Sequence, residues 1–372
     1  MNPHVMVLGP ARTAVSGVST HLNHLFDSTL GDRFHLSQYQ VGSADRGEGT
    51  LDTLLRVITS PFGLTARLLR DQPSIVHINT SFNPKAYWRD LTYMASAKML
   101  RRKVVYQVHG GPFPGDFFAN NRVLTAMLRR ILSWPDVVVL LSTRHMQAYR
   151  DFAPAAKLAM VAYGVEIHDA DLNIERYAPA RPLQIVNIGR FVQAKGIFDI
   201  VDAVGILRSR GIRVRVRFVG SGPEEQQLRR AIVDAGLDDR MELLEPVFGH
   251  AKQQLWRSAN VLALPSYSEG LPLALLESMC AGTVPVITPV GGIPDVMQNQ
   301  VHGLFVSPRN PIEVADALQQ LHEDREGLRG MAIAGRQRIV DQYSVGRFAS
   351  EFQSLYADLV QTIPATVTRA AP

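Results

Sequence analysis

Short apolar runs alternate with longer amphipathic stretches along most of the chain. In the first half, the apolar runs predict strands at 4–8, 34–41, 75–78, 103–108, 137–141 and 157–161. In the second half, they predict strands at 184–188, 213–219, 241–244, 261–264, 284–287 and 303–306. Helical periodicity fills the intervals, notably at 18–30, 51–69, 85–100 and 121–134. Such alternation is typical of doubly wound parallel sheets, so the pattern predicts two Rossmann-like α/β domains.

The two series of strands are separated by a segment that follows neither period. Residues 175–182 contain two prolines and are predicted to form a linker. We therefore place an N-terminal domain at 1–176 and a C-terminal domain at 183–343, because 372 residues exceed what one core usually holds. A last amphipathic helix is predicted within 344–361.

One predicted strand carries an unusual alternation of charge. Arg213, Arg215 and Arg217 alternate with apolar residues, so they share one face of the strand. We expect an outer strand of the sheet with one face in water. An anion-binding row of arginines is the alternative.

Positive charge is concentrated in the first half of the chain. The net charge is +5, and residues 1–180 hold 19 basic against 14 acidic side chains. Within 56–130 the numbers are 12 and 3. Such an excess favours an anionic partner, for example an anionic membrane surface, although a solvated basic surface explains it equally well. The helix at 121–134 either docks at such a surface or contributes its apolar stripe to the core.

The sequence contains no run of apolar residues as long as a membrane span. Its start lacks the basic segment of a secretory signal, so we expect none. Cys280 is the only cysteine, and it is expected to be a small buried side chain. The expected location is therefore the cytoplasm, with the inner face of the cytoplasmic membrane as an option.

The most informative stretch has Glu269 and Glu277 with seven residues between them. A strand at 261–264 leads into the loop that carries Glu269, and Pro272 suits the first turn of a helix that ends near Gly282. Glu277 then lies about one and a half turns into that helix. The helix start offers free N–H groups for a diphosphate, and carboxylates accept hydrogen bonds from sugar hydroxyls. The stretch therefore predicts a sugar-nucleotide site.

Other predicted strands in the second half also end in candidate binding loops. Arg190 and Lys195 follow the first of these strands, and together they suit a diphosphate. Gly220 begins a glycine-rich turn that either admits a nucleotide or is a plain tight turn, and it does not match the nicotinamide fingerprint. Gly291 and Gly292 line a ligand or serve only the turn.

The first half offers weaker candidates. Ser16 and Gly17 enter the first helix, where they either contact an anion or form an ordinary helix cap. His109 follows the strand at 103–108 and precedes two glycines, which places it at a carboxyl end where ligands bind.

No metal site is predicted. His21 and His24 lie one turn apart without an apparent third ligand. Asp169 and Asp171 have the spacing of an Asp-x-Asp motif, but no suitable buried strand precedes them.

Four elements of the second half, taken together, resemble glycosyltransferase family 4, the retaining GT-B enzymes of glycosyl transferases group 1. They are 189–196, 220–223, 269–277 with its Glu-Gly-Leu-Pro sequence, and 285–294. The resemblance implies two Rossmann-like domains that face a cleft, with the helix at 344–361 crossing back to complete the N-terminal, acceptor-binding domain. It also implies that 183–343 bind the nucleotide sugar and that transfer retains the anomeric configuration without a metal or a cofactor.

The resemblance also implies roles for individual residues. Arg190 and Lys195 would neutralise the leaving diphosphate, Glu269 would contact the sugar, and Glu277 would hold the ribose. His109 would lie near the sugar and acceptor. The donor-binding positions it implies are Gly17, Gly189, Gly220, Gly270, Leu271 and Glu277.

The donors favoured by the resemblance are UDP-sugars and GDP-mannose, with a saccharide, a lipid-linked sugar or a glycolipid as acceptor. Surface polysaccharide biosynthesis is the favoured setting, and no nucleic acid partner is expected. The alternatives are a GT-B sugar-nucleotide epimerase, a phosphorylase and a non-catalytic module that only binds sugar nucleotides. A complete set of Arg190, Lys195, Glu269 and Glu277 argues for transfer.

Overall fold

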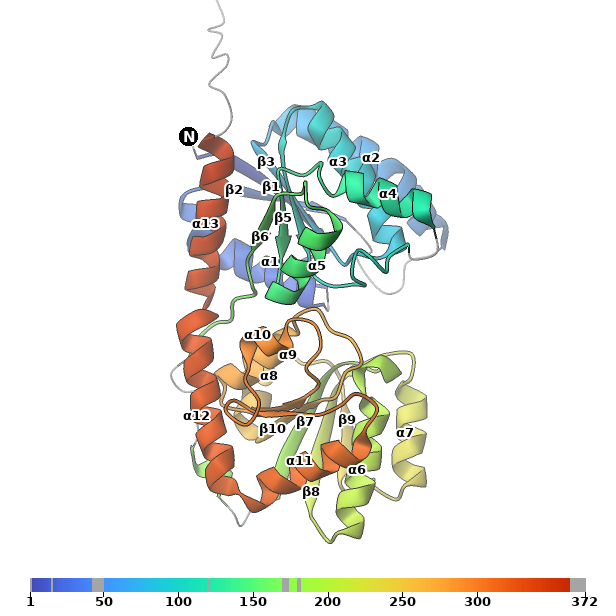
Figure 1. Cartoon of the computed structure of the whole chain (residues 1–372), viewed down its shortest axis with the longest axis vertical. Coiled ribbons are helices and arrows are strands. Elements are labelled where there is room, and N and C mark those ends of the chain that lie inside the picture. Colours follow the sequence, from blue (N-terminus) through green and yellow to red (C-terminus); the bar gives the residue numbers. More distant parts are fainter. Residues whose placement is uncertain are drawn as a thin grey trace, which may run out of the picture. The chain divides into compact units, whose positions relative to one another are not determined.

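The chain folds into two compact units, seen here in a computed structural model (Figure 1). Unit 1 comprises Met1–Tyr163 and Val345–Pro372, and unit 2 comprises Gly164–Ser344. The structure describes residues 2–14, 16–41, 50–118, 121–168, 174–178 and 182–361, with the backbone alone at 50–58.

Unit 1 is built on six parallel strands, and every one of them lies where an apolar run predicts it. They are β1 (His4–Gly9), β2 (His35–Gln40), β3 (Ile75–Thr80), β4 (Lys103–Val108), β5 (Val137–Leu140) and β6 (Leu158–Met160). Their order is β2-β1-β3-β4-β5-β6, so the sheet changes direction between β1 and β3. In doubly wound sheets this change of direction marks the binding edge.

Helices cover both faces of this sheet. Its helices are α1 (Gly17–Asp27), η1 (Thr29–Asp32), α2 (Thr50–Asp71), α3 (Pro84–Met99), α4 (Arg122–Ile131), α5 (Thr143–Phe152) and α13 (Val345–Gln361). Figure 1 shows α2, α3 and α4 together on one face, where Leu64, Tyr93 and Leu128 share a core with Val76. The opposite face is covered by α1 and α13.

The last helix belongs to the core of unit 1, as the resemblance implies. Phe348, Phe352 and Tyr356 on α13 are buried with Val5 and Val7 of β1. Their spacing of four residues puts all three aromatic rings on one helical face. The polypeptide therefore closes the first unit with its last helix, after the whole of unit 2.

The apolar stripe predicted on α4 also belongs to the core. Leu128 and Ile131 are buried, whereas Arg129 and Arg130 are exposed. Only Val123, which is 77% exposed, extends an apolar side chain well into water. The arginines of this helix are free to face solvent, whereas its apolar stripe packs in the core of unit 1. None of the described helices combines the length and the apolar composition needed to cross a membrane.

Unit 2 repeats the architecture, again with all six predicted strands. They are β7 (Leu183–Arg190), β8 (Val214–Ser221), β9 (Met241–Leu244), β10 (Val261–Leu264), β11 (Val284–Ile287) and β12 (Leu304–Phe305). The order β12-β11-β10-β7-β8-β9 is the Rossmann order, with its change of direction between β7 and β10. The connecting elements are η3 (Ile174–Tyr177), η4 (Gln193–Lys195), α6 (Ile197–Ser209), α7 (Glu225–Asp234), α8 (Gly249–Ser258), α9 (Leu273–Cys280), α10 (Ile293–Val296), α11 (Pro311–Glu323) and α12 (Arg325–Gln342).

The prediction that the arginine-bearing strand lies at the sheet edge is wrong. β8 pairs with β7 on one side and with β9 on the other. Its apolar face, including Val214 and Val216, is buried, while Arg213 and Arg215 are exposed. The alternation of charge indicates that one face of the sheet is exposed to solvent at this strand. An inner strand can have such a face, so the alternation does not identify an edge strand.

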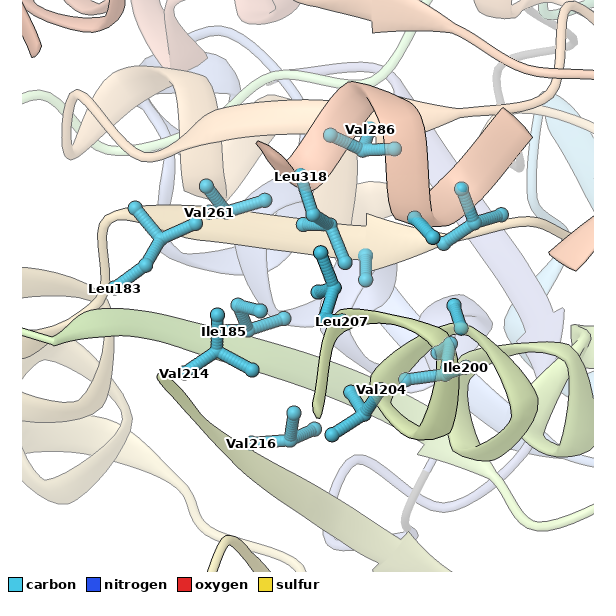
Figure 2. Close-up of a cluster of buried hydrophobic side chains, with 14 of the residues drawn as sticks. Leu183, Ile185, Ile200, Val204, Leu207, Val214, Val216, Val261, Val286 and Leu318 are labelled. Atoms are coloured by element: carbon cyan, nitrogen blue, oxygen red, sulfur yellow. The ribbon is translucent and has the colours of Figure 1, made fainter. Parts of the chain in front are cut away.

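The core of unit 2 lies between its sheet and the helices on one side. Figure 2 shows Ile185 and Val214 of the strands lying close to Val204 and Leu207 of α6 and Leu318 of α11. All five side chains are fully buried. This packing fixes the sheet, and with it the positions at which the strands end.

The division between the units lies earlier in the chain than the predicted linker. Arg176 and Tyr177 are buried in unit 2, although both lie within the predicted linker. The Arg176 guanidinium donates to the Trp256 carbonyl at 2.9 Å, and the Tyr177 hydroxyl donates to the Gly282 carbonyl at 2.5 Å. These side-chain anchors have no periodic sequence signal, so the segment resembles a linker. Of the predicted linker, 179–181 lie outside the described residues.

Removing the Phe352 ring should destabilise unit 1 strongly. We expect Phe352→Ala to lower the free energy of unfolding by about 3–5 kcal/mol, because the change leaves a cavity among buried aromatic side chains. Urea unfolding measures this loss. The exposed Ser354 lies on the same helix, and Ser354→Ala should stay within about 0.5 kcal/mol of the unchanged protein. Equal effects of the two substitutions would contradict the packing of α13.

Candidate functional site

The candidate site of unit 2 lies at the carboxyl edge of its sheet. β7 ends at Arg190, the loop after it carries Lys195, and the loop after β10 carries Glu269. Because β7 and β10 are parallel neighbours, both loops leave the sheet at the same edge. This pair also flanks the change of strand direction, where doubly wound sheets bind their ligands.

The two loops are joined through their backbones. Tyr267 N–H donates to the Ala194 carbonyl at 2.8 Å. Gly196 has a φ of 69°, and a Cβ atom there would collide with the backbone of Pro265. A glycine is therefore required at this position to bring the loops together.

An ion pair connects the side chains of these loops. Lys195 Nζ lies 2.6 Å from Glu269 Oε1, and the Glu269 side chain is only 7% exposed against 27% for that of Lys195. A mostly buried carboxylate needs such a partner, since an unpaired buried charge is costly. Two residues that lie 74 positions apart in the sequence thus meet at this edge of the sheet.

A second polar contact joins the Glu269 loop to α6. The Tyr267 hydroxyl donates to the buried carboxylate of Asp199 on α6 at 3.4 Å, and the Arg309 guanidinium lies 4.3 Å from the centre of the Tyr267 ring. Burial raises the pKa of Asp199. Sequence reasoning did not identify Asp199 or Arg309, which lie on different elements and in no recognisable motif.

The glycines after β11 complete the same edge. Gly292 N–H donates to the Gly270 carbonyl at 2.6 Å. Gly291 has a φ of 58°, and a Cβ atom there would collide with the carbonyl groups of Glu269 and Gly270. Leu271, which follows, is buried. The predicted loops 269–271 and 291–292 are therefore in contact, and the contact alone accounts for Gly291.

Glu277 is held separately, on α9. The helix begins at Leu273 after Pro272, close to the predicted start. Lys252 of α8 places its Nζ 2.7 Å from Glu277 Oε1, and the Glu277 side chain is 16% exposed. The second oxygen, Oε2, is buried without a hydrogen-bond partner among the described residues. Lys252 could not be identified from the sequence, because nothing distinguishes it from other helical lysines.

Arg190, Gly189 and Gly220 lie at the ends of β7 and β8. Gly189 pairs with Gly220 in the parallel register, and a Cβ atom on Gly220 would collide with the Gly189 carbonyl. Close strand packing therefore explains Gly220 without a ligand. The Arg190 side chain is exposed and has no described hydrogen-bond partner, so its guanidinium is available to an anion.

In unit 1, Gly17 lies at the start of α1, just after the loop that follows β1. The Ser16 hydroxyl caps this helix by accepting from Ser19 N–H at 3.1 Å. The ordinary cap is therefore present. The position also lies at the change of strand direction between β1 and β3, so a binding role for Gly17 stays a prediction.

His109 lies at the end of β4 in a closed network of hydrogen bonds. Asn79 donates its Nδ2 to the Leu8 carbonyl at 3.1 Å, so its Oδ1 accepts from His109 Nε2 at 2.7 Å. The Tyr163 hydroxyl then donates to Nδ1 at 2.6 Å. Burial lowers the pKa of His109 to about 3, so the ring is neutral and both nitrogens are engaged. This geometry positions the ring and does not offer it as a proton carrier.

Two further buried histidines lie beside His109. The His21 ring centre is 4.7 Å from that of His109. His77 Nδ1 forms a 2.7 Å hydrogen bond with the Tyr356 hydroxyl of α13. Burial lowers the pKa of His77 to about 3, and burial together with His109 and His77 lowers that of His21 well below the usual range.

Within the part of the chain that the structure describes, no three His, Cys, Asp or Glu side chains are grouped so as to hold a metal ion. His21, one of the two histidines considered as metal ligands, packs against the ring of His109. Asp169 and Asp171 lie outside the described residues.

Comparisons with known proteins find relatives among glycosyltransferases. Residues 172–338 match the family model described as glycosyl transferases group 1. The chain is 30% identical over 237 residues to the GDP-mannose-dependent alpha-(1-6)-phosphatidylinositol monomannoside mannosyltransferase of Mycobacterium tuberculosis, covering 59% of this chain and 61% of that protein. It is 24% identical over 262 residues to the amylovoran biosynthesis glycosyltransferase AmsK of Erwinia amylovora, covering 69% and 60%. Against other curated relatives the match spans about half of their length.

The fold also has solved counterparts. Anabaena Alr3699/HepE in complex with UDP-glucose superposes with a TM-score of 0.73 at 16% identity, over 95% of this chain and 99% of that one. The likeness shows the fold, which is that of GT-B proteins with two Rossmann-like domains.

The three buried histidines should make unit 1 lose stability as the pH falls below about 6.5. Their pKa values are lowered on folding, so the unfolded chain takes up protons that the folded chain refuses. Each histidine then contributes a slope approaching 1.4 kcal/mol per pH unit, by the linkage relation, and stability rises again toward neutral pH. Urea unfolding at pH 7, 6 and 5 measures the slope.

We expect His21→Phe, which keeps an aromatic ring, to reduce the dependence of stability on pH by the contribution of about one proton. His250→Gln, at an exposed histidine of unit 2, is the matched control. A slope unchanged by His21→Phe would contradict the assignment of a neutral buried ring.

Proposed function

We propose that this chain, whose residues 172–338 belong to the group 1 glycosyltransferases, transfers a sugar from a nucleoside diphosphate sugar to an acceptor. The observation that carries the proposal is the Lys195–Glu269 ion pair at the β7–β10 edge, with Glu277 held nearby in the sequence on α9. Cations and carboxylates are both needed for such a donor, since its phosphates are anionic and its sugars offer hydroxyls. A purely structural pair does not require the exposed Arg190 at the same edge.

The leaving diphosphate is assigned to Arg190 and Lys195. The Lys195 ammonium forms an ion pair with Glu269. A bound diphosphate would draw the ammonium toward its own oxygens and leave Glu269 to accept from sugar hydroxyls. Donor binding and sugar recognition are then coupled through one lysine. Because these side chains stabilise the departing charge, the proposed reaction uses no metal and no cofactor.

The rest of the donor is assigned to the adjoining loops and α9. The backbone N–H groups of Gly270 and Leu271 would position the sugar or a phosphate, in loops fixed by the Gly270–Gly292 contact. Gly189 and Gly220 would lie along the nucleotide, and Glu277 would accept from the ribose hydroxyls. Gly17 would contribute from unit 1.

We propose retention of the anomeric configuration. The bond between the anomeric carbon and the phosphate oxygen breaks, and the acceptor oxygen bonds to the same face of the sugar. The acceptor proton passes to the leaving phosphate oxygen, so no separate base is needed. His109 fits this scheme as a neutral residue that contacts the sugar or acceptor, because both of its ring nitrogens are already hydrogen-bonded.

The donor is proposed to be a UDP-sugar or GDP-mannose, in view of the relatives that use GDP-mannose or bind UDP-glucose. The acceptor is proposed to be a saccharide, a lipid-linked sugar or a glycolipid, bound by unit 1. Two relatives are named for polysaccharide or phosphatidylinositol mannoside synthesis, which supports surface polysaccharide or glycolipid assembly as the setting.

The site residues predict the effect of two substitutions on transfer. Lys195→Ala and Glu269→Gln should each lower turnover by about 10²-fold or more, because each removes charge that faces the reacting centre. A thermal-shift screen with UDP, GDP and ADP first identifies the nucleotide. Release of that nucleotide from its sugar donor, in the presence of a membrane extract as acceptor source, then measures turnover.

The exposed Lys157 of unit 1 provides the control, since Lys157→Ala should leave turnover unchanged. Circular dichroism and the melting temperature check that each variant is folded. Undiminished turnover in either site variant would overturn the assignment, and stable binding without any turnover would favour a non-catalytic module.

We further propose that unit 1 meets anionic lipid at the cytoplasmic face of a membrane. Arg129 and Arg130 on α4 are exposed, within the segment that carries most of the excess charge. Each arginine near an anionic surface contributes about 1 kcal/mol, and salt weakens the attraction.

Arg129→Glu with Arg130→Glu should therefore reduce flotation with phosphatidylserine vesicles by about tenfold or more, with little effect on neutral vesicles. The same change at Arg229 and Arg230, an exposed pair on α7 of unit 2, is the matched control. Vesicle binding that depends neither on lipid charge nor on these arginines would contradict the proposal.

A further inference from the structure

We propose that Lys252 is a positioning residue of the nucleotide site, which aims the carboxylate of Glu277 at the ribose. The proposal rests on the function proposed above. Lys252 lies in the first turns of α8, and α8 leads directly into β10. Its Nζ is 2.7 Å from Glu277 Oε1 on α9, the helix that follows β10. The ion pair therefore joins α8 and α9, the two helices that precede and follow β10 in the sequence.

The contact differs from an ordinary surface ion pair in its burial. The side chains of Lys252 and Glu277 are 25% and 16% exposed. The three i,i+4 pairs at Arg67–Asp71, Arg229–Glu225 and Arg347–Glu351 each include an arginine that is at least 41% exposed. An exposed pair gains little in water, whereas a pair withdrawn from water is held in one geometry by its own charges.

The two oxygens of Glu277 are used unequally. Oε1 accepts from Lys252, while Oε2 is buried and has no hydrogen-bond partner among the described residues. A buried acceptor without a donor is unfavourable and calls for an explanation. A ribose hydroxyl supplies the missing donor, because a carboxylate can only accept and a hydroxyl can donate.

Lys252 acts on this oxygen through the carboxylate. By holding Oε1, the ammonium fixes the orientation of the carboxylate plane and so the direction of Oε2. Without Lys252 the carboxylate is free to rotate, and its hydrogen bond to the ribose loses its alignment.

The test compares ribose with deoxyribose. Isothermal titration measures the dissociation constants of UDP against 2′-deoxy-UDP, and of GDP against 2′-deoxy-GDP, for the full chain and its variants. We expect the unchanged protein to prefer the ribonucleotide by roughly tenfold to hundredfold, the range of one hydrogen bond to a charged group. Lys252→Met should reduce this ratio toward one, and Lys252→Arg should restore most of it.

The controls separate failure of this inference from failure of the proposed function. Glu277→Gln should also reduce the ratio, and His250→Ala, at an exposed position on α8, should leave it unchanged. If Glu277→Gln loses the preference while Lys252→Met keeps it, Lys252 has no positioning role. If the unchanged protein binds neither nucleotide or shows no preference for ribose, the ribose contact assigned to Glu277 is wrong.

Kinetics give a second readout that a loss of stability alone would not produce. Lys252→Met should raise the KM for the sugar nucleotide with little change in kcat, because Glu277 binds the part of the donor that does not react. An equal fall in kcat and kcat/KM, with an unchanged KM, would overturn the proposal.

Discussion

The candidate site depends on the parallel pairing of β7 with β10. β7 contributes Gly189 and Arg190 at its end, and β10 contributes the position from which the Glu269 loop leaves the sheet. Because they are neighbours running in the same direction, Lys195 and Glu269 emerge side by side although 74 positions separate them. The buried side chains between the sheet and α6 keep that pairing in register. Packing on one face of the sheet thus sets distances at its edge.

Acidic and basic side chains are paired at this edge of the sheet. Glu269 and Glu277 each have a lysine partner, and the two lysines come from different elements. A site of this kind need not reorganise its backbone to bind, since only side-chain partners are exchanged. The cost of such exchange is the loss of an ion pair that is partly shielded from water, and the ligand must supply stronger contacts than those it replaces.

Much of the fold was predictable because the signals are local. Most strands contain several of the residues Val, Ile and Leu, and the Glu269 loop and α9 follow from a strand, a proline and a glycine in order. The pairing of Lys195 with Glu269, the role of Lys252 and the closed network around His109 were not predictable, because they join residues from separate elements. The burial of Arg176 was missed for the same reason, since its partners are backbone carbonyls of distant segments.

The docking of α13 on unit 1 bears on how the protein is made. During synthesis the N-terminal sheet leaves the ribosome early, but the rings of Phe348, Phe352 and Tyr356 follow only after the whole of unit 2. Until then α1 covers that face of the sheet without α13, and the contacts of Val5 and Val7 with the last helix are not yet formed. Unit 2 holds its own core within one continuous segment and can close first. Unit 1 therefore completes its core only after the whole of unit 2 has been synthesised.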